Sequence, residues 1–356
     1  MTVWLRACAG MTLGVLVAGC SSDGPAGTLP TCEGGTDATK RPITDLGTGC
    51  YLQYRGGLYP NGENALSGAH LAAGLAAAAQ IAPLDVAGQP SASGKYVLVS
   101  IGMSNTTQEF CNDGQQVGTC LPPGFVASAA SDAAVNHTTL AIVNGAAGGR
   151  AASSWVSATS AEYDRIRDTW LTPLGLSEAQ VQIGWVKVAN PGPTASLPAA
   201  NADAFALLTS IGQIARAMKT RYPNLRQIFI SSRIYAGYAT TPLNPEPYAY
   251  ESAFSVKWAI ESQIAQMAGG AADARAGDLR YDTSVASWLG WGPYLWADGT
   301  NARSDGLTWV VSDFSPSDGT HPAMSAREKV AGMLLTFFKT SPAASCWFLA
   351  GQTCQP

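Results

Sequence analysis

The sequence predicts an α/β protein with three layers, α/β/α, built around a central parallel sheet of about five strands. Short apolar runs rich in β-branched and aromatic residues alternate with longer segments that carry apolar residues at helical spacing. Several of the apolar runs end in a glycine or an asparagine that opens a polar loop. With 356 residues, of which 46% are hydrophobic, the chain is long enough to bury the core of such a domain.

Five apolar runs are candidate strands, at residues 96–101, 139–143, 181–188, 226–231 and 288–294. The first run, Tyr-Val-Leu-Val-Ser-Ile, is the strongest, whereas glycines interrupt the last. Helical spacing of apolar residues predicts helices at 66–81, 163–171, 201–222, 248–267 and 323–339. Strands and helices therefore alternate through most of the chain, which is typical of parallel strands joined by crossover helices.

The N-terminus has the pattern of an export signal. One positive residue, Arg6, precedes an apolar stretch that is too short to span a bilayer. The stretch ends in Leu-Val-Ala-Gly-Cys at residues 16–20, which resembles the lipobox of bacterial lipoproteins. The resemblance implies a signal peptide over 1–19, cleavage before Cys20 and an acylated Cys20 that anchors the chain to a membrane. An ordinary secretory signal that contains a cysteine is the alternative.

The rest of the chain is expected to form a tether followed by one domain. Residues 20–31, rich in Ser, Gly and Pro, are expected to form a flexible lipidated tether. Residues 32–356 are expected to form a single domain, on which the Gly- and Pro-punctuated segment 32–94 packs as an N-terminal extension. The formal net charge of −4 and the lack of Lys/Arg runs argue against nucleic acid as a partner.

Cysteine usage also indicates an exported protein. Apart from Cys8 and Cys20, the six cysteines fall into three sequence-local couples, and proximity predicts the disulfides Cys32–Cys50, Cys111–Cys120 and Cys346–Cys354. Six cysteines allow fifteen connectivities, so the pairing remains a prediction. The chain has no Cys-x-x-Cys and only 3 histidines, so we expect no metal site. Disulfides of this kind form in an oxidising, extracytoplasmic compartment, which leaves the protein facing the periplasm or the cell surface.

A nucleophile and a base are suggested by two short motifs. Gly102-Met103-Ser104-Asn105 directly follows the first candidate strand, and Asp318 lies three residues before His321 ahead of the last helix. On a tight turn that spacing lets the carboxylate reach Nδ1 of the imidazole, which leaves Nε2 free to act as a base for a serine hydroxyl. The alternative is structural: Gly, Ser and Asn favour turns, and Asp318 would then only cap backbone amides.

Taken together, four blocks resemble the SGNH/GDSL hydrolases. These are Ser104 in its turn, the glycine-rich loop at 144–149, Asn190 after the third candidate strand, and the Asp318–His321 pair. The resemblance covers about 96–338 and implies the three-layer flavodoxin-like fold of that family. In parallel sheets of this kind, ligands bind at the carboxyl ends of the strands, where the first three loops begin.

Carried over residue by residue, the resemblance implies a serine hydrolase. Ser104 would be the nucleophile, His321 the general base, and Asp318 the residue that orients the imidazole. The oxyanion hole would consist of the backbone N–H groups of Ser104 and Gly149 and the side-chain amide of Asn190. In the second block Gly148 or Gly145 remains an alternative to Gly149. The third block lacks the usual Gly-x-Asn-Asp spelling, and Gly184 and Lys187 compete there with Asn190.

The spelling of the first block bears on the substrate. Met103 replaces the usual acidic residue, so Gly-Met-Ser-Asn is closest to the Gly-Gln-Ser-Asn of sialate-O-acetylesterase-like carbohydrate esterases. The resemblance implies an esterase that removes O-acyl groups, acetyl above all, from carbohydrate without a cofactor. Asn105, Arg150 and Trp185 are candidate contacts to the substrate. The alternatives are a short-chain esterase or lipase without sugar preference, and a non-catalytic glycan-binding lipoprotein on the same scaffold.

The other histidines and the tryptophans have structural interpretations. His70, at a helix start, is expected to be structural or on the surface, and His137 is expected in a loop before the second strand. Four tryptophans are candidates either for a sugar-stacking platform or for the core, and the core is favoured for at least half of them: Trp155, Trp185, Trp291 and Trp296.

Overall fold

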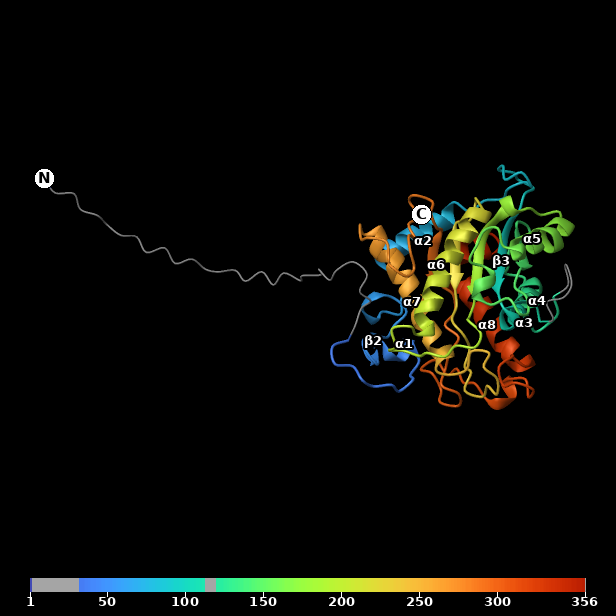
Figure 1. Ribbon diagram of the computed structural model, residues 1–356. Helices are drawn as coiled ribbons and strands as arrows, with labels where there is room; N and C mark the ends of the chain where they lie inside the picture. The colour runs from blue at the N-terminus through green and yellow to red at the C-terminus, as the bar shows by residue number, and fades with distance from the viewer. Residues whose placement is uncertain (2–31, 113–119, 356) are drawn as a thin grey trace.

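The computed structural model describes residue 1, residues 32–112 and residues 120–355 (Figure 1). The predicted signal peptide, the tether and the lipidation site Cys20 thus lie outside the described residues, apart from Met1. Among the described residues, no helix combines the length and apolar character that crossing a bilayer requires.

A parallel sheet of five strands forms the centre of the molecule, which confirms the predicted α/β class. In spatial order the strands are β4 (Leu140–Asn144), β3 (Tyr96–Gly102), β5 (Val181–Lys187), β6 (Gln227–Ile230) and β7 (Trp288–Trp291). All four neighbouring pairs are parallel. Numbered along the chain this order is 2-1-3-4-5, the flavodoxin-like order, whose ligands bind where the direction of winding reverses, beside β3.

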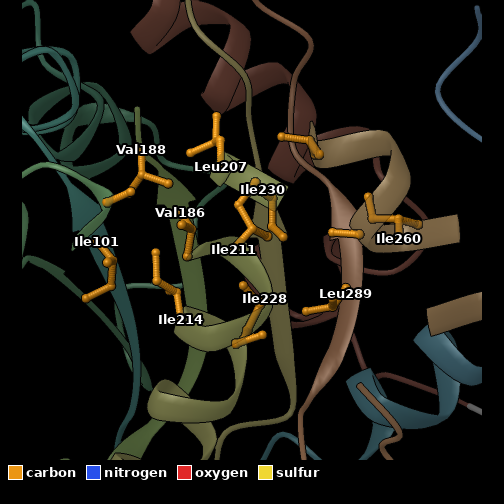
Figure 2. Packing of buried hydrophobic residues seen from close by; sticks show 14 of the residues in the cluster. Ile101, Val186, Val188, Leu207, Ile211, Ile214, Ile228, Ile230, Ile260 and Leu289 are labelled. Carbon is orange, nitrogen blue, oxygen red and sulfur yellow. The ribbon is translucent and has the colours of Figure 1, made fainter. Parts of the chain in front are cut away.

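Both faces of the sheet are buried because successive side chains of each strand enter opposite cores. In β3, Val97 and Val99 face one apolar cluster, whereas Leu98 faces the other. The same alternation separates Ile228 from Phe229 in β6. Figure 2 shows the first cluster, where aliphatic side chains of β3, β5, β6 and β7 meet those of α6 and α7. A strand that is buried on both faces needs an apolar residue at almost every position, as the sequence has.

The helices form the outer layers of the sandwich. The first cluster is covered by α5 (Ala161–Arg165), a π-helical turn that continues it (Ile166–Leu171), α6 (Asp203–Arg221) and α7 (Tyr248–Met267). The second is covered by α2 (Gly68–Ala79), α3 (Ser104–Cys111), α4 (Phe125–Ser131), α8 (Met324–Thr340) and α9 (Ser345–Phe348). Figure 1 labels α6, α7 and α8 around the sheet.

The expected elements agree with the observed ones except in detail. The fifth strand ends at Trp291 rather than at 294 because Pro293, which has no N–H to donate, follows Gly292. The helix expected at 163–171 is a short α-helix followed by the π-helical turn. The short helices α3, α4 and α9 fall in segments whose apolar periodicity is too short to identify a helix.

The segment 32–94 packs against the outer face of α7 and the edge of the sheet. It contains α1 (Ile43–Leu46), the two-stranded ribbon β1 (Cys50–Tyr51) and β2 (Tyr54–Arg55), and α2. Tyr54 lies against Trp258, with ring centroids 5.1 Å apart, and the hydroxyl of Tyr51 donates to Glu251 at 3.0 Å. These contacts make the segment part of the same core as the main body.

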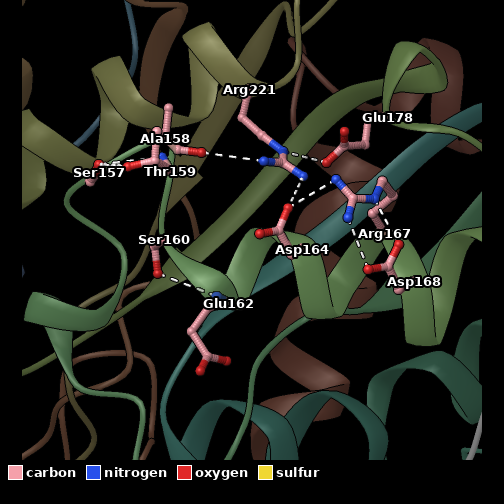
Figure 3. A network of polar contacts seen from close by, with 10 residues as sticks. All are labelled: Ser157, Ala158, Thr159, Ser160, Glu162, Asp164, Arg167, Asp168, Glu178 and Arg221. Atoms are coloured by element: carbon pink, nitrogen blue, oxygen red, sulfur yellow. Dashed lines mark hydrogen bonds and ion pairs between the residues drawn. The ribbon is translucent and has the colours of Figure 1, made fainter.

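Disulfides and ion pairs tie the periphery together. The structure contains the three local disulfides, Cys32–Cys50, Cys111–Cys120 and Cys346–Cys354. Figure 3 shows a network in which Arg221, at the end of α6, bonds to Asp164 in α5 and to Glu178 just before β5. The network fixes the C-terminal end of α6 to α5 and to the segment that precedes β5.

Candidate active site

A close backbone approach sets the position of Ser104, the first residue of α3. Gly102 ends β3 opposite Lys187 of β5, and a Cβ atom at Gly102 would lie 2.2 Å from the carbonyl oxygen of Lys187. Thr106, in the first turn of α3, donates its hydroxyl to the same carbonyl at 2.6 Å. Only glycine fits between the two strands here, so the turn brings Ser104 directly over the carboxyl edge of the sheet.

Ser104, His321 and Asp318 form a continuous hydrogen-bonded chain. Nε2 of His321 lies 2.8 Å from Oγ of Ser104, and Nδ1 of His321 lies 2.6 Å from Oδ2 of Asp318. With the proton on Nδ1, the imidazole donates to the carboxylate and Nε2 accepts from the serine hydroxyl. This is the geometry in which a histidine can remove the proton of a serine as the oxygen attacks an acyl carbon.

The loop that carries the histidine also holds Asp318 in its ionised form. Partial burial raises the pKa of Asp318, but hydrogen bonds from the His321 backbone N–H, the His321 ring and the Thr320 N–H outweigh burial and leave the pKa below its ordinary value. The two backbone N–H groups bond to Oδ1 at 3.0 Å and 2.8 Å. The second oxygen is thereby left for the imidazole.

Backbone donors for an oxyanion lie beside the serine. Ser104 lies in the first turn of α3, where N–H groups have no partner within the helix and where the helix dipole favours negative charge. Gly149 lines the same pocket with φ +73°, whereas Gly145 donates its N–H to the hydroxyl of Ser100 at 3.2 Å. Of the three candidate glycines in this loop, Gly149 lines the pocket, whereas Gly145 and Gly148 are not among the described residues that line it.

Asn190 also lines the pocket, and its side chain is fixed in place. One N–H of its amide is donated to Oδ1 of Asp203 at 2.9 Å, which leaves the second N–H of the amide available to a bound group. The competing residues of this block are otherwise occupied. Gly184 lies inside β5, against Met218, and Lys187 is fully buried in an ion pair with Glu109 of α3.

These residues surround one small pocket. Its volume is about 100 Å³, and among its lining residues are Ser104, Asn105, Gly149, Asn190, Arg233 and His321. Asn105 is buried and donates to the carbonyl of Thr320 at 3.0 Å, so it joins α3 to the histidine loop. Met103 lines the pocket beside the serine.

Sequence reasoning missed the partner of Lys187 and a second buried cation near the serine. Lys187 and Glu109 form a completely buried ion pair between β5 and α3. Arg233, just beyond β6, is also buried and lines the pocket. The available signal is positional: each of the three residues lies at or just beyond a strand end or in α3, at the same edge of the sheet.

Two of the predicted substrate contacts lie elsewhere. The prediction for Trp185 is wrong, because the side chain is fully buried between the sheet and α3, stacks on Phe110 and donates Nε1–H to Ser231 at 3.1 Å. The side chain of Arg150 is 47% exposed and pairs with Glu162 at 2.6 Å, and Arg150 is not among the described residues that line the pocket. The four tryptophans weighed as a sugar platform are all buried: Trp155, Trp185, Trp291 and Trp296.

The remaining histidines have the structural positions that were expected. His70 is buried against Trp288, bonds to the carbonyl of Leu289 at 2.8 Å, and burial lowers its pKa to about 4. His137 lies in an exposed loop, where Nε2 lies 3.1 Å from the carbonyl of Asp132. Within 32–112 and 120–355, no three His, Cys, Asp or Glu side chains are grouped so that they could hold a metal ion.

No family model matches the chain, and a comparison with curated proteins found no match. Solved structures give faint similarities. A family 2 carbohydrate esterase with its carbohydrate-binding domain, from Corynascus thermopiles (Myceliophthora fergusii), is 11% identical with a TM-score of 0.36 over 69% of this chain and 66% of that chain. A Parabacteroides merdae protein described as a putative GDSL-like lipase is 12% identical with a TM-score of 0.34, and the match covers 72% of this chain and 97% of that protein.

The salicylyl-acyltransferase SsfX3 of a tetracycline biosynthetic pathway is 13% identical with a TM-score of 0.34, and the match covers 72% of this chain but only 58% of the acyltransferase. Because identity and structural overlap are this low, the functional conclusion rests on the geometry of the site.

Proposed function

We propose that this protein is a serine esterase of the SGNH type that hydrolyses short-chain carboxylic esters through Ser104, His321 and Asp318. The hydrogen-bonded chain from Ser104 Oγ through His321 to Asp318 carries the proposal. Ser104 meets the local Asp318–His321 pair, 217 positions further along the chain, in the order and at the distances that nucleophilic catalysis needs. The sequence blocks of the SGNH hydrolases supply the same three residues independently.

The proposed reaction proceeds through an acyl-enzyme. Oγ of Ser104 attacks the acyl carbon while its proton passes to Nε2 of His321, and the negative charge develops on the former carbonyl oxygen. The N–H groups of Ser104 and Gly149 and the free amide N–H of Asn190 stabilise that oxygen. The ester bond then breaks, the alcohol leaves with the proton from His321, and water attacks the acyl-enzyme by the same steps to release the acid.

Pocket size supports a small acyl group. A cavity of about 150 Å³ holds a benzene ring, and the pocket beside Ser104 is smaller, at about 100 Å³. An acetyl or butyryl group fits this space, which favours a short acyl chain. The favoured alcohol is a carbohydrate hydroxyl, which the Gly-Met-Ser-Asn spelling supports; a short-chain esterase without sugar preference is the alternative. The buried tryptophans give no support for sugar stacking.

The test of the activity is hydrolysis of 4-nitrophenyl acetate and of acetylated saccharides, together with labelling by a fluorophosphonate. We expect wild type to turn over the esters and to be labelled, and Ser104→Ala to lose both. Asp318→Asn is expected to reduce kcat by about 10³- to 10⁴-fold while Ser104 remains in place. If wild type neither hydrolyses any ester nor reacts with the fluorophosphonate, the non-catalytic glycan-binding alternative replaces the proposal.

We also propose that the chain is a lipid-anchored exported protein. The lipobox-like residues 16–20 and the three disulfides support export to an oxidising compartment and acylation of Cys20. Membrane fractionation of wild type and Cys20→Ser tests this: wild type is expected in the membrane fraction and the variant in the soluble fraction. If wild type and Cys20→Ser divide in the same way between the membrane and soluble fractions, the proposal that Cys20 carries a lipid anchor is rejected.

A further inference from the structure

Arg233 is a buried cation at the wall of the pocket. It follows β6 at the carboxyl edge of the sheet, its exposed fraction is 1%, and it lines the same pocket as Ser104 and His321. Nη1 of Arg233 lies 4.0 Å from the sulfur of Met103, the residue before the nucleophile. The guanidinium therefore lies beside the reacting serine.

The hydrogen-bonding capacity of this guanidinium is largely unused. Among the described residues, Nε and Nη2 of Arg233 have no hydrogen-bond partner, although both atoms are buried. Nη1 contacts only a thioether sulfur, which is a weak acceptor. A buried arginine ordinarily directs its planar fork of donors at a carboxylate or another strong acceptor.

The acidic residues that influence Arg233 are already engaged. Glu109 is bound to Lys187 in the buried ion pair. Glu246 accepts hydrogen bonds from Trp296 Nε1–H at 2.7 Å and from the backbone N–H groups of Ala236 and Tyr250 at 3.1 Å. No carboxylate of the described chain lies within ion-pair distance of the Arg233 guanidinium, so the protein supplies charge beside Ser104 without a direct counter-ion.

We propose that Arg233 is a specificity-determining residue that binds a carboxylate carried by the ester substrate. The inference rests on the esterase function proposed above and defines its substrate class: esters that bear a carboxylate within reach of the reacting carbonyl group. That carboxylate belongs either to the acyl half, as in a dicarboxylic acid monoester, or to the alcohol half, as in an acylated uronic acid. Both forms present the same planar pair of oxygens to the guanidinium.

Two substrate pairs distinguish the two sources. For the acyl half, monoethyl succinate is compared with ethyl 4-methylpentanoate, in which an isopropyl group replaces the carboxylate. For the alcohol half, O-acetylated methyl glucuronoside is compared with O-acetylated methyl glucoside. We expect wild type to prefer the carboxylate member of one pair by about 10- to 100-fold in kcat/KM. The pair that shows the preference identifies which half carries the carboxylate.

The variants Arg233→Met and Arg233→Lys test the residue itself. The preference ratio is expected to collapse in Arg233→Met and to be partly retained in Arg233→Lys, which keeps the charge but not the fork. Arg280→Met removes an arginine that pairs with Asp278 in an exposed loop, and it is the matched control, expected to keep the wild-type ratio. Circular dichroism verifies folding, and the wild-type comparison stands even if Arg233 variants do not fold.

The outcomes separate this inference from the proposed function. If wild type hydrolyses the esters without preference for either carboxylate member, or if Arg233→Met keeps the preference, the role of Arg233 is overturned and the esterase stands. If Arg233→Met loses charged and neutral turnover in equal proportion, Arg233 is a structural residue and the inference also fails. If wild type hydrolyses none of the four compounds and is not labelled by a fluorophosphonate, the esterase function fails first.

Discussion

The side-chain amide of Asn105 donates a hydrogen bond to the backbone carbonyl of Thr320 at 3.0 Å. Asn105 follows the proposed nucleophile in α3, and Thr320 precedes the proposed base in the loop before α8. The bond therefore joins the two halves of the Ser104–His321 pair, which are separated by 217 positions in the sequence. It joins the start of α3 to the loop that precedes α8.

Removal of this bond is expected to slow catalysis. Asn105→Ala should lower kcat/KM for 4-nitrophenyl acetate and the rate of fluorophosphonate labelling by about 10-fold, since one buried hydrogen bond is worth about 1–1.5 kcal/mol. Asn64→Ala is the matched control, because Asn64 makes the same type of bond to Thr44 at 2.8 Å in an exposed segment. Full activity in Asn105→Ala would contradict a positioning role.

Replacement of Gly102 is expected to damage both the fold and the site. A Cβ atom there would lie 2.2 Å from the carbonyl oxygen of Lys187, so Gly102→Ala must push β3 away from β5 and shift Ser104. Urea unfolding should show a loss of more than about 1 kcal/mol, and kcat should fall. Gly332→Ala, in α8 with open space around its Cβ position, is the control and should be neutral or stabilising. Equal behaviour of the two variants would refute the steric argument.

Removal of one partner of the buried pair Lys187–Glu109 is expected to destabilise the protein more than removal of both partners. Lys187→Met leaves a buried carboxylate without its partner and should lower the free energy of unfolding by about 3–5 kcal/mol. Replacement of both residues, Lys187→Met with Glu109→Gln, should recover part of that loss. Arg167→Met, which breaks exposed pairs with Asp164 and Asp168, should change the unfolding transition little. A double variant no more stable than Lys187→Met would argue against the ion pair as the cause.

Glu251 is expected to make stability depend on pH. Burial raises the pKa of Glu251 to about 7, although hydrogen bonds from the Leu197 N–H and the Tyr51 hydroxyl oppose the shift. Because the folded pKa is higher than the unfolded value of 4.5, folding favours the protonated form. Stability contributed by this group is therefore complete below pH 4.5 and is lost as pH rises through about 7.

The check compares urea unfolding at pH 5 and pH 8 for wild type and for Glu251→Gln, which does not titrate. The free energy of unfolding should fall more steeply with pH in wild type than in the variant. Identical pH dependence would mean that Glu251 is ionised in both states.

Much of the fold could be read from local pattern. The run from Tyr96 to Gly102 is apolar at nearly every position because β3 is buried on both faces, and the same holds for β5. The long helices α6, α7 and α8 had enough turns for their spacing to be distinctive. The helix α3 did not, because Ser-Asn-Thr-Thr at its start has little helical preference, and its place is set by contacts such as that of Thr106 with Lys187.

The candidate site divides in the same way. Ser104, Asp318 and His321 stand in short motifs with their own chemical logic, so the sequence by itself determined the proposed reacting groups and the class of sheet that gathers them. Only the tertiary structure decided that Trp185 is core, that Asn105 ties two segments together, and that Arg233 lies buried beside the serine. The physical reason is distance along the chain: spacing reveals neighbours within a helix or a turn, whereas burial and the partners of a charge are set by segments that meet only when the sheet is formed.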